Sequence, residues 1–404
     1  MPIEIRACAD AADLRASMAS IWHYFGLPPT DEAVGNFAVL VGPERALVAH
    51  VDGALAGGCC AFPIELTTPG GRVKAAGVTM VGVQPTHRRR GVLTAMMRRQ
   101  LDDSRARGEA VAYLWASEER IYGRFGYGLT GLSADVEISR ERAEFFTGAA
   151  TVGRVRLVAL AEALNPVRAI FAQVAATRPG MFARSDEWLM RRNLVDLSWM
   201  RAGGGELVCA LLDIDGAPAA YALYRFDAKW ERGGIPAGVV RVAEAMATTP
   251  EAMRAIWRYL LDLDWCATIK AGFLPVDHPL VLLAAEPRRM RTQLRDGCFA
   301  RIVDVEAALR ARKYGPGEIV IEIADAFCPW NAGRWLVRDD GATRTDRAAD
   351  LSCDVSALAS AYLGGFSWAQ IVASCRAKAA SEEAVTRADR VFERRGAPWV
   401  PEIF

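Results

Sequence analysis

A buried strand that leads through a short turn into an amphipathic helix occurs twice in this chain, and the repeat limits the folds open to it. The first copy covers residues 76–107 and the second covers residues 238–263. In the first helix, Leu93, Met96, Met97 and Leu101 recur on one side at helical spacing. Strands that alternate with helices are typical of α/β folds. The sequence therefore predicts a duplicated α/β unit.

The turns of the two copies predict different chemistry. The first reads His-Arg-Arg-Arg-Gly over residues 87–91, and the second reads Thr-Thr-Pro-Glu over residues 248–251. The start of a helix presents free N–H groups and partial positive charge, to which the arginines add full charge. A glycine lets the backbone approach phosphates closely. The first turn is thus either a pyrophosphate site or an exposed basic turn, whereas the acidic second turn is not expected to hold phosphate.

Composition excludes several classes of protein. Apolar residues make up 52% of the 404 residues and the formal charge is +1, which argues against chain-wide disorder and against nucleic-acid binding. No apolar run is long enough for a membrane span, and the first residues do not resemble a signal peptide, so we expect a cytoplasmic protein without membrane contact. Nine cysteines without a CxxC pair, and four histidines without an HExxH motif, predict no metal site.

Three domains are expected, at residues 1–145, 146–292 and 293–404. Strand and helix signals alternate through the first domain up to a last strand at 129–138, and residues 141–153 have the composition of a linker. The pattern changes again near residue 295. The chain ends on Ala-Pro-Trp-Val-Pro-Glu-Ile-Phe over residues 397–404, and this apolar end predicts a tail packed inside the protein.

Two segments of the first domain resemble a known enzyme family. Residues 88–93 resemble the acetyl-CoA loop of GNAT N-acetyltransferases, R/Q-x-x-G-x-G/A, with Leu93 departing at the last position. Residues 83–91 and 116–128, the second containing Ile-Tyr-Gly-Arg-Phe-Gly-Tyr-Gly, resemble the Eis (enhanced intracellular survival) family of these enzymes. The similarity extends to Tyr362-Leu363-Gly364-Gly365 and to the aromatic last residue.

The resemblance implies a fold and an activity. The expected fold is α+β, with two tandem GNAT-like α/β domains, the second degenerate, and a C-terminal sterol-carrier-like α+β domain. The expected activity is direct transfer of an acetyl group from acetyl-CoA to an amine. By resemblance, strand amides near Val81 and Val83 hold the acetyl carbonyl. The resemblance also assigns cofactor contacts to Ser117 and to the loop and first helical turn: Arg88, Arg89, Arg90, Gly91, Val92, Leu93 and Thr94.

The resemblance to the family also implies which residues act as general acid and general base. Tyr122 matches the family's general acid, and its ordinary pKa near 10 suits a donor to a leaving thiolate. Tyr127, five residues later, is the rival candidate, and either ring could simply pack beside the glycines. The family uses the C-terminal carboxylate as base, which here belongs to Phe404, and burial would make it more basic. His23 and Glu402 are the other base candidates, and an anchoring role of the tail is the alternative.

The sequence does not decide which class of molecule accepts the acetyl group. Aminoglycosides or similar polyamines are the first expectation, in a pocket lined by Trp22, His23, Tyr24, Met80, Glu402 and Ile403. Lysine side chains of proteins or peptides are the alternative acceptor. A lipid- or apolar-ligand-binding module without catalysis is a further alternative, suggested by the sterol-carrier-like domain. The family also implies a homo-hexamer, arranged as a trimer of dimers.

Overall fold

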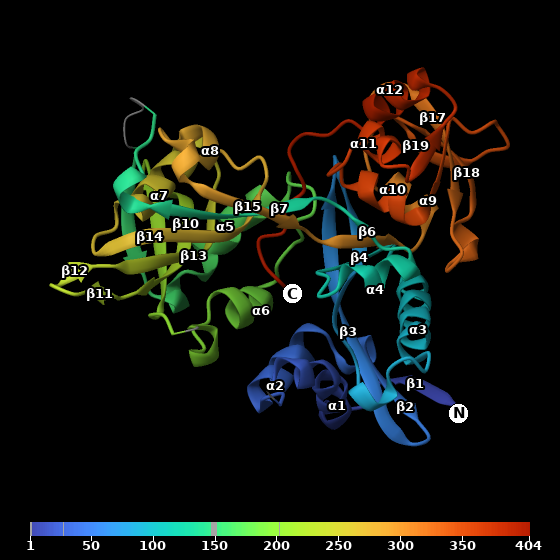
Figure 1. Ribbon diagram of the computed structural model, residues 1–404, viewed down its shortest axis with the longest axis horizontal. Coiled ribbons are helices and arrows are strands. Elements are labelled where there is room, and N and C mark those ends of the chain that lie inside the picture. The colour runs from blue at the N-terminus through green and yellow to red at the C-terminus, as the bar shows by residue number, and fades with distance from the viewer. Residues whose placement is uncertain (1, 27, 147–151, 202) are drawn as a thin grey trace. The chain divides into compact units, whose positions relative to one another are not determined.

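A computed structural model describes residues 2–26, 28–146, 152–201 and 203–404 (Figure 1). The chain divides into two compact units. The first comprises residues 1–131, 297–398 and 403–404, and the second comprises residues 132–296 and 399–402. The expected linker at 141–153 falls partly on residues 147–151, which lie outside the described residues. None of the described helices is both long enough and apolar enough to cross a membrane.

The first unit is built on a seven-stranded sheet with the order β1-β2-β3-β4-β5-β16-β6. Its strands are β1 (Ile3–Ala7), β2 (Ala46–Val51), β3 (Ala54–Thr68), β4 (Gly71–Val83), β5 (Val111–Leu114), β16 (Phe299–Ile302) and β6 (Gly128–Leu129). Neighbours are antiparallel except β4 and β5, which are parallel and joined by α3 (Val92–Ala106). The strand–turn–helix predicted at 76–107 is confirmed.

Residues at the β2–β3 turn and at the start of the first helix explain the local structure at the beginning of this unit. Asp52 and Gly53 take φ values of 51° and 80°, the turn conformation that suits the twist of the β2–β3 hairpin. The first helix, α1 (Ala11–Trp22), begins where the Asp10 side chain accepts hydrogen bonds from two backbone N–H groups. In the sequence, Val51-Asp52-Gly53 between two strand-forming runs predicts a hairpin, and Asp10 ahead of a helical pattern that runs to Ile21 predicts a helix start, so both predictions are confirmed. Two further helices complete this part, α2 (Asp31–Leu40) and α4 (Glu119–Tyr122).

Adjacent glycines let helices lie against both faces of β3. A Cβ atom on Gly57 would lie 3.1 Å from Cε of Met96 on α3. A Cβ atom on Gly58 would lie 2.5 Å from Cα of Ser17 on α1. Because successive strand residues point to opposite faces, α3 and α1 cover the two sides of the sheet.

A second sheet in the first unit has five strands in the order β19-β18-β17-β20-β21. Its strands are β17 (Glu318–Ala324), β18 (Gly333–Arg338), β19 (Gly341–Arg344), β20 (Leu351–Asp354) and β21 (Ala377–Ala379). Its helices are α9 (Val305–Arg310), α10 (Val355–Tyr362), α11 (Trp368–Ala373) and α12 (Glu382–Val391). Tyr362 and Trp368 are fully buried among these helices. This α+β arrangement agrees with the domain expected near the end of the chain.

The second unit contains another seven-stranded sheet, with the order β15-β7-β14-β13-β10-β9-β8. Its strands are β7 (Leu132–Ser139), β8 (Arg154–Val158), β9 (Leu207–Ile214), β10 (Ala217–Asp227), β13 (Gly238–Ala247), β14 (Cys266–Pro275) and β15 (Arg291–Asp296), and a small hairpin is formed by β11 (Trp230–Glu231) and β12 (Ile235–Pro236). Its helices are α5 (Leu164–Ala175), α6 (Asp186–Trp188), α7 (Pro250–Asp262) and α8 (Leu280–Leu283). As in the first unit, a helix joins two parallel strands, β13 and β14.

The two seven-stranded sheets exchange strands along the chain. The strand expected at 129–138 is confirmed from Leu132 onward as β7, which pairs with β14 and β15 in the second unit, but Leu129 belongs to a separate strand, β6, which pairs with β16 in the first. In return, β16 follows the second sheet in sequence but lies between β5 and β6 of the first. The sheets therefore divide the chain near residues 131 and 296, whereas composition placed the domain limits near 145 and 292. Short apolar strands carry no local mark of the sheet that they join.

Candidate active site

The parallel strands β4 and β5 separate at the centre of the first sheet. They pair only over Ala75–Gly77 and Val111–Tyr113. Beyond Gly77, the described residues provide no strand partner for the β5-facing edge of β4, although β4 continues to Val83 beside β3. Backbone N–H and C=O groups need partners, so this edge is available to a ligand.

A β-bulge lies just beyond the point of separation. The pairing with β3 slips between Thr79 and Gly82, so that Met80 and Val81 face only Cys59. Met80 takes a φ of 54°, which is uncommon for a residue with a side chain. Helix α1 lies directly on this bulge, because a Cβ atom on Gly82 would come within 2.6 Å of the Ile21 backbone nitrogen. Bulges of this kind redirect backbone groups beside active sites.

The predicted phosphate turn connects β4 to α3. Arg88, Arg89 and Arg90 are exposed, and Arg89 and Gly91 take left-handed φ values of 61° and 85°. Gly91 occupies the N-cap position of α3, and no side chain among the described residues caps this helix. Val92 is buried, Leu93 is half-buried, and Thr94 is exposed in the first helical turn. The structure therefore brings together three cations and uncapped N–H groups, which suit a phosphate-bearing cofactor.

Tyr122 ends the short helix α4 and packs against the α3 side of the sheet. Its ring belongs to a core cluster with Val78 and Leu114, while 6% of its surface stays exposed. Burial raises the pKa of Tyr122 to about 12, with smaller contributions from Cys59 and Glu118. Tyr122 is therefore protonated at neutral pH and can act as a donor.

Tyr127, the rival of Tyr122, packs edge-on against it with ring centroids 5.6 Å apart. Its hydroxyl is enclosed and has no hydrogen-bond partner among the described residues. Burial raises its pKa well above the ordinary value. Of the two residues, Tyr122 thus has the more accessible position. Ser117 lies exposed in the bend before α4.

Phe404 lies on the opposite side of the same strands. Its main-chain oxygen accepts a hydrogen bond of 3.0 Å from Oγ1 of Thr79. Its ring stacks on Tyr113, with centroids 6.1 Å apart, and a Cβ atom on Gly77 would lie 3.4 Å from it. The packed C-terminus predicted from the apolar tail is therefore confirmed, with Phe404 only 5% exposed.

Alternation along the strands shows that Tyr122 and Phe404 face opposite sides of the sheet. Tyr122 clusters with Val78 and Leu114, whereas Phe404 contacts Thr79 and Tyr113, which are their sequence neighbours. Thr79 and Tyr113 were not singled out from the sequence. Thr79 lies within the glycine-containing segment, but its role depends on a partner 325 residues away in sequence.

Three of the predicted acceptor-pocket residues meet at the bulge. Nε1 of Trp22 lies 3.3 Å from Sδ of Met80, and the Tyr24 hydroxyl donates a 2.9 Å hydrogen bond to the Val83 carbonyl. His23 is exposed, with its ring edge-on to Tyr24 at 5.4 Å. These contacts tie the end of α1 to the end of β4. Ile403, next to the last residue, is 57% exposed.

Glu402 has a different environment, within the second unit. Its carboxylate accepts hydrogen bonds from Arg184 at 2.6 Å, Trp188 at 3.0 Å and Asn193 at 3.3 Å. These donors fill much of its bonding capacity. The described residues contain no group of three His, Cys, Asp or Glu side chains placed to hold a metal ion.

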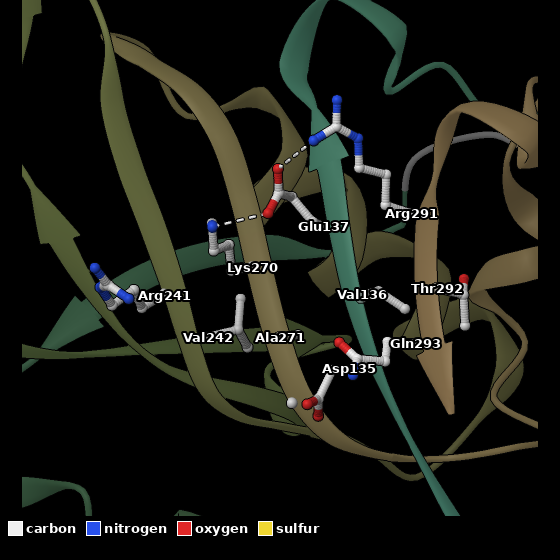
Figure 2. A pocket seen from close by; sticks show the side chains of 11 residues that line it. Asp135, Val136, Glu137, Arg241, Val242, Lys270, Ala271, Arg291, Thr292 and Gln293 are labelled. Atoms are coloured by element: carbon white, nitrogen blue, oxygen red, sulfur yellow. Dashed lines mark hydrogen bonds and ion pairs between the residues drawn. The ribbon is translucent and has the colours of Figure 1, made fainter. Parts of the chain in front are cut away.

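The second unit also carries a hollow of about 500 Å³ on one face of its sheet, shown in Figure 2. Charged side chains line it, and each of them has an ion-pair partner. Glu137 on β7 binds Lys270 at 2.8 Å and Arg291 at 3.3 Å. Arg241 binds Asp227 at 2.5 Å. Such exposed ion pairs contribute little binding energy and leave few charges available to a ligand.

Comparisons with known proteins agree with this architecture. Models of the acetyltransferase (GNAT) domain match residues 5–130 and 180–302, and a sterol carrier protein domain model matches residues 305–401. An uncharacterized N-acetyltransferase of Streptomyces avermitilis is 39% identical over 98% of this chain and 99% of its own. The N-acetyltransferase Eis of Mycobacterium tuberculosis is 34% identical over 89% of this chain and 92% of its own. The crystal structure of Eis1 from Mycobacterium abscessus superposes with a TM-score of 0.87 at 36% identity, covering 99% of this chain and all of that one.

Proposed function

Because the chain belongs to the Eis family of GNAT N-acetyltransferases, we propose that it transfers the acetyl group of acetyl-CoA to amines of aminoglycosides or similar polyamines. One observation carries the proposal for this site. The Phe404 terminus and Tyr122 lie on opposite faces of β4 and β5, the two strands that separate just before the bulge. A base and an acid are thereby available on either side of one gap in the strand pairing.

The residues around the turn fit acetyl-CoA. Gly91 leaves the N-terminus of α3 without a side-chain cap, and Arg88, Arg89 and Arg90 are exposed beside it. In this proposal the backbone from Arg89 to Thr94 binds the pyrophosphate, and Ser117 makes a further contact. The backbone at Val81 and Val83 binds the acetyl carbonyl at the open edge of β4. When bound, acetyl-CoA supplies a thioester carbonyl as the electrophile.

Two groups of the protein are proposed to accept and donate the protons of the reaction. The Phe404 carboxylate, fixed by Thr79, takes a proton from the acceptor ammonium at its oxygen. The Tyr122 hydroxyl holds a proton for the leaving sulfur. Its pKa of about 12 lies above the ordinary thiol value of about 8.5, so a hydrogen bond donated to the leaving sulfur is favoured over complete transfer of the proton.

Trp22, His23, Tyr24, Met80 and Ile403 are proposed to line the acceptor pocket, and the enzyme is proposed to be a homo-hexamer. Two acids that could attract a polycation are already engaged, because Asp31 pairs with Arg15 and Glu402 with Arg184. Aromatic surface at the end of α1 is therefore the main recognition element in this proposal, through cation–π and stacking contacts with an amine-bearing ring.

The first test is mass spectrometry of reaction products. Purified protein with a free C-terminus is incubated with acetyl-CoA and a panel of aminoglycosides, simple polyamines and lysine peptides. The proposal expects mass increments of one or more acetyl groups on an aminoglycoside or polyamine. If only peptides are acetylated, the proposed mechanism stands but the acceptor is a lysine side chain and not an aminoglycoside or polyamine. Intact acetyl-CoA with every acceptor would contradict the proposed function and favour an apolar-ligand-binding module.

A further inference from the structure

The second GNAT unit repeats the separated strands of the first unit. Strand β13 pairs in parallel with β14 only up to Val242, and its later residues pair with β10 alone among the described residues. A bulge at Ala243 precedes Glu244, in the place that Met80 and Val81 take in β4. The helix that follows, α7, is capped by its own Thr249 side chain. This unit thus keeps the open strand geometry without a free anion site.

The chain's own C-terminal tail lies at this second separation. The Trp399 backbone N–H donates a 2.8 Å hydrogen bond to the Pro179 carbonyl. Its indole Nε1 donates a 2.5 Å hydrogen bond to the Phe273 carbonyl on β14, and its ring packs in the cluster that contains Met246 of β13. Trp399 therefore bonds to β14, and shares a hydrophobic cluster with a residue of β13, beyond the point where the two strands part.

Three residues later, the tail is fixed by a buried charge cluster. Arg184 has no exposed side-chain surface and binds Glu402 through Nε at 2.6 Å. Its two other nitrogens bind Glu244 of β13 at 2.9 and 2.7 Å. Burial opposes the charge of Arg184, but Glu244 and Glu402 hold its pKa above the ordinary value. Trp188 adds a neutral donor to Glu402 at 3.0 Å.

We propose that the degenerate GNAT unit serves as a clamp for the C-terminal tail, in which Arg184 and Trp188 hold Glu402 so that the Phe404 carboxylate stays seated at Thr79. The inference rests on the proposed function, because it assigns the clamp to the base of that reaction. Glu402 is thereby a positioning residue and does not bind the acceptor amine. The open strands of the second unit hold a peptide of the same chain at the place where, in the first unit, cofactor and acceptor are proposed to bind.

The decisive variant is Glu402→Ala in the full chain, with Glu393→Ala as its matched control. Glu393 is exposed and lies in the same tail, nine residues earlier. The first readout is release of Phe404 by carboxypeptidase, followed by mass spectrometry under native conditions. Because cleavage needs the tail to leave its seat, we expect release about 10-fold faster in Glu402→Ala and unchanged in Glu393→Ala. Equal rates in wild type and Glu402→Ala would overturn the clamp.

Steady-state kinetics separate positioning from acceptor binding. A displaced base lowers kcat, by about 10- to 100-fold for a displacement near 1 Å, and leaves KM for the amine nearly unchanged. An acid that bound the acceptor would instead raise KM for the amine and preserve kcat. That second pattern would overturn the proposal. A purely structural role would lower the melting temperature without changing either constant at temperatures where the protein is folded.

A milder variant covers the case in which Glu402→Ala does not fold. Trp188→Phe removes one donor to Glu402 and keeps a ring in place, so release of Phe404 should quicken by about 2- to 5-fold. Unchanged release in this variant contradicts the clamp. In every variant, activity is compared with the fraction of Phe404 released. If activity persists after Phe404 is lost, the proposed base fails, while faster release would still support the clamp.

Discussion

Two tyrosines of one motif illustrate how burial decides chemistry at the scale of a residue. Tyr122 and Tyr127 lie with ring centroids 5.6 Å apart, and burial raises the pKa of both. The Tyr127 hydroxyl is enclosed and lacks a partner among the described residues. A donor must reach its acceptor, so the more accessible Tyr122 is the better candidate. Sequence spacing alone could not separate the two.

Replacing Tyr122 with Phe should lower kcat by about 100-fold, the usual effect of removing a general acid. Because burial raises its pKa to about 12, the phenol remains protonated in alkaline solution, and wild-type kcat should not fall through its ionisation between about pH 8 and about pH 10. Stopped assays by mass spectrometry across this range measure both effects. Tyr127→Phe is the matched control, and the opposite ranking of the two variants would make Tyr127 the donor.

At the scale of elements, the two crossover helices differ at their N-cap residue. Gly91, the N-cap of α3, has a φ of 85° and provides no side-chain cap, whereas Thr249, the N-cap of α7, accepts a hydrogen bond at its Oγ1 from the Ala252 N–H. A capped helix has already used one of its free N–H groups. The same fold thus leaves a helix end without a side-chain cap in one unit and a side-chain-capped helix end in the other.

Gly91→Ala should weaken binding of acetyl-CoA. There is space for a methyl group, since the nearest atom would be Cδ1 of Ile3 at 3.8 Å, but the left-handed φ costs about 1–2 kcal/mol with a side chain present. We expect a similar loss of stability and a KM for acetyl-CoA that rises about 5- to 10-fold as the turn relaxes.

Gly108→Ala is the matched control for this change. Gly108 follows the other end of α3 and has a φ of 72°, and an added Cβ atom would meet no described atom within 4 Å beyond its chain neighbours. Thermal unfolding should show comparable destabilisation in both variants, with KM altered only in Gly91→Ala. An equal rise of KM in both would assign the effect to the whole helix and not to the turn.

At the scale of the whole molecule, segments late in the sequence complete structures that begin early in it. Strand β16 joins the first sheet after the second unit is complete, and Phe404 reaches Thr79 across 325 residues. The tail residues 399–402 belong to the second unit, and residues 403–404 belong to the first. Assembly of the proposed site therefore requires most of the chain to be folded, because the proposed base, Phe404, follows the whole second sheet in sequence.

Adding one glycine after Phe404 should reduce kcat by about 100-fold or more, because the carboxylate beside Thr79 becomes a neutral peptide group. KM for acetyl-CoA should stay near the wild-type value, since the phosphate turn is unchanged. The same glycine added before Met1 is the control. Retention of most of the activity in the C-terminally extended protein would exclude Phe404 as the base and return attention to His23.

The sequence by itself determined the features that depend on neighbouring residues. The Asp52-Gly53 turn, the Asp10 and Thr249 caps, the basic turn at 88–91 and the repeated strand–turn–helix all follow from local backbone preferences and periodicity, and the structure contains each of them. The long motifs also identified the family, because their residues are contiguous.

Only the tertiary structure decided which distant segments meet. The assignment of β7 and β16 to different sheets, the seat of Phe404 at Thr79 and the capture of Glu402 by Arg184 depend on pairings between remote parts of the chain. Strands pair through backbone groups, which nearly all residues share, so the residue type does not identify the partner strand. A charged residue is usually exposed, so the sequence does not show which charged residues become buried as ion pairs. Local patterns carry no record of such partners, so these features emerged only when the sheets were assembled.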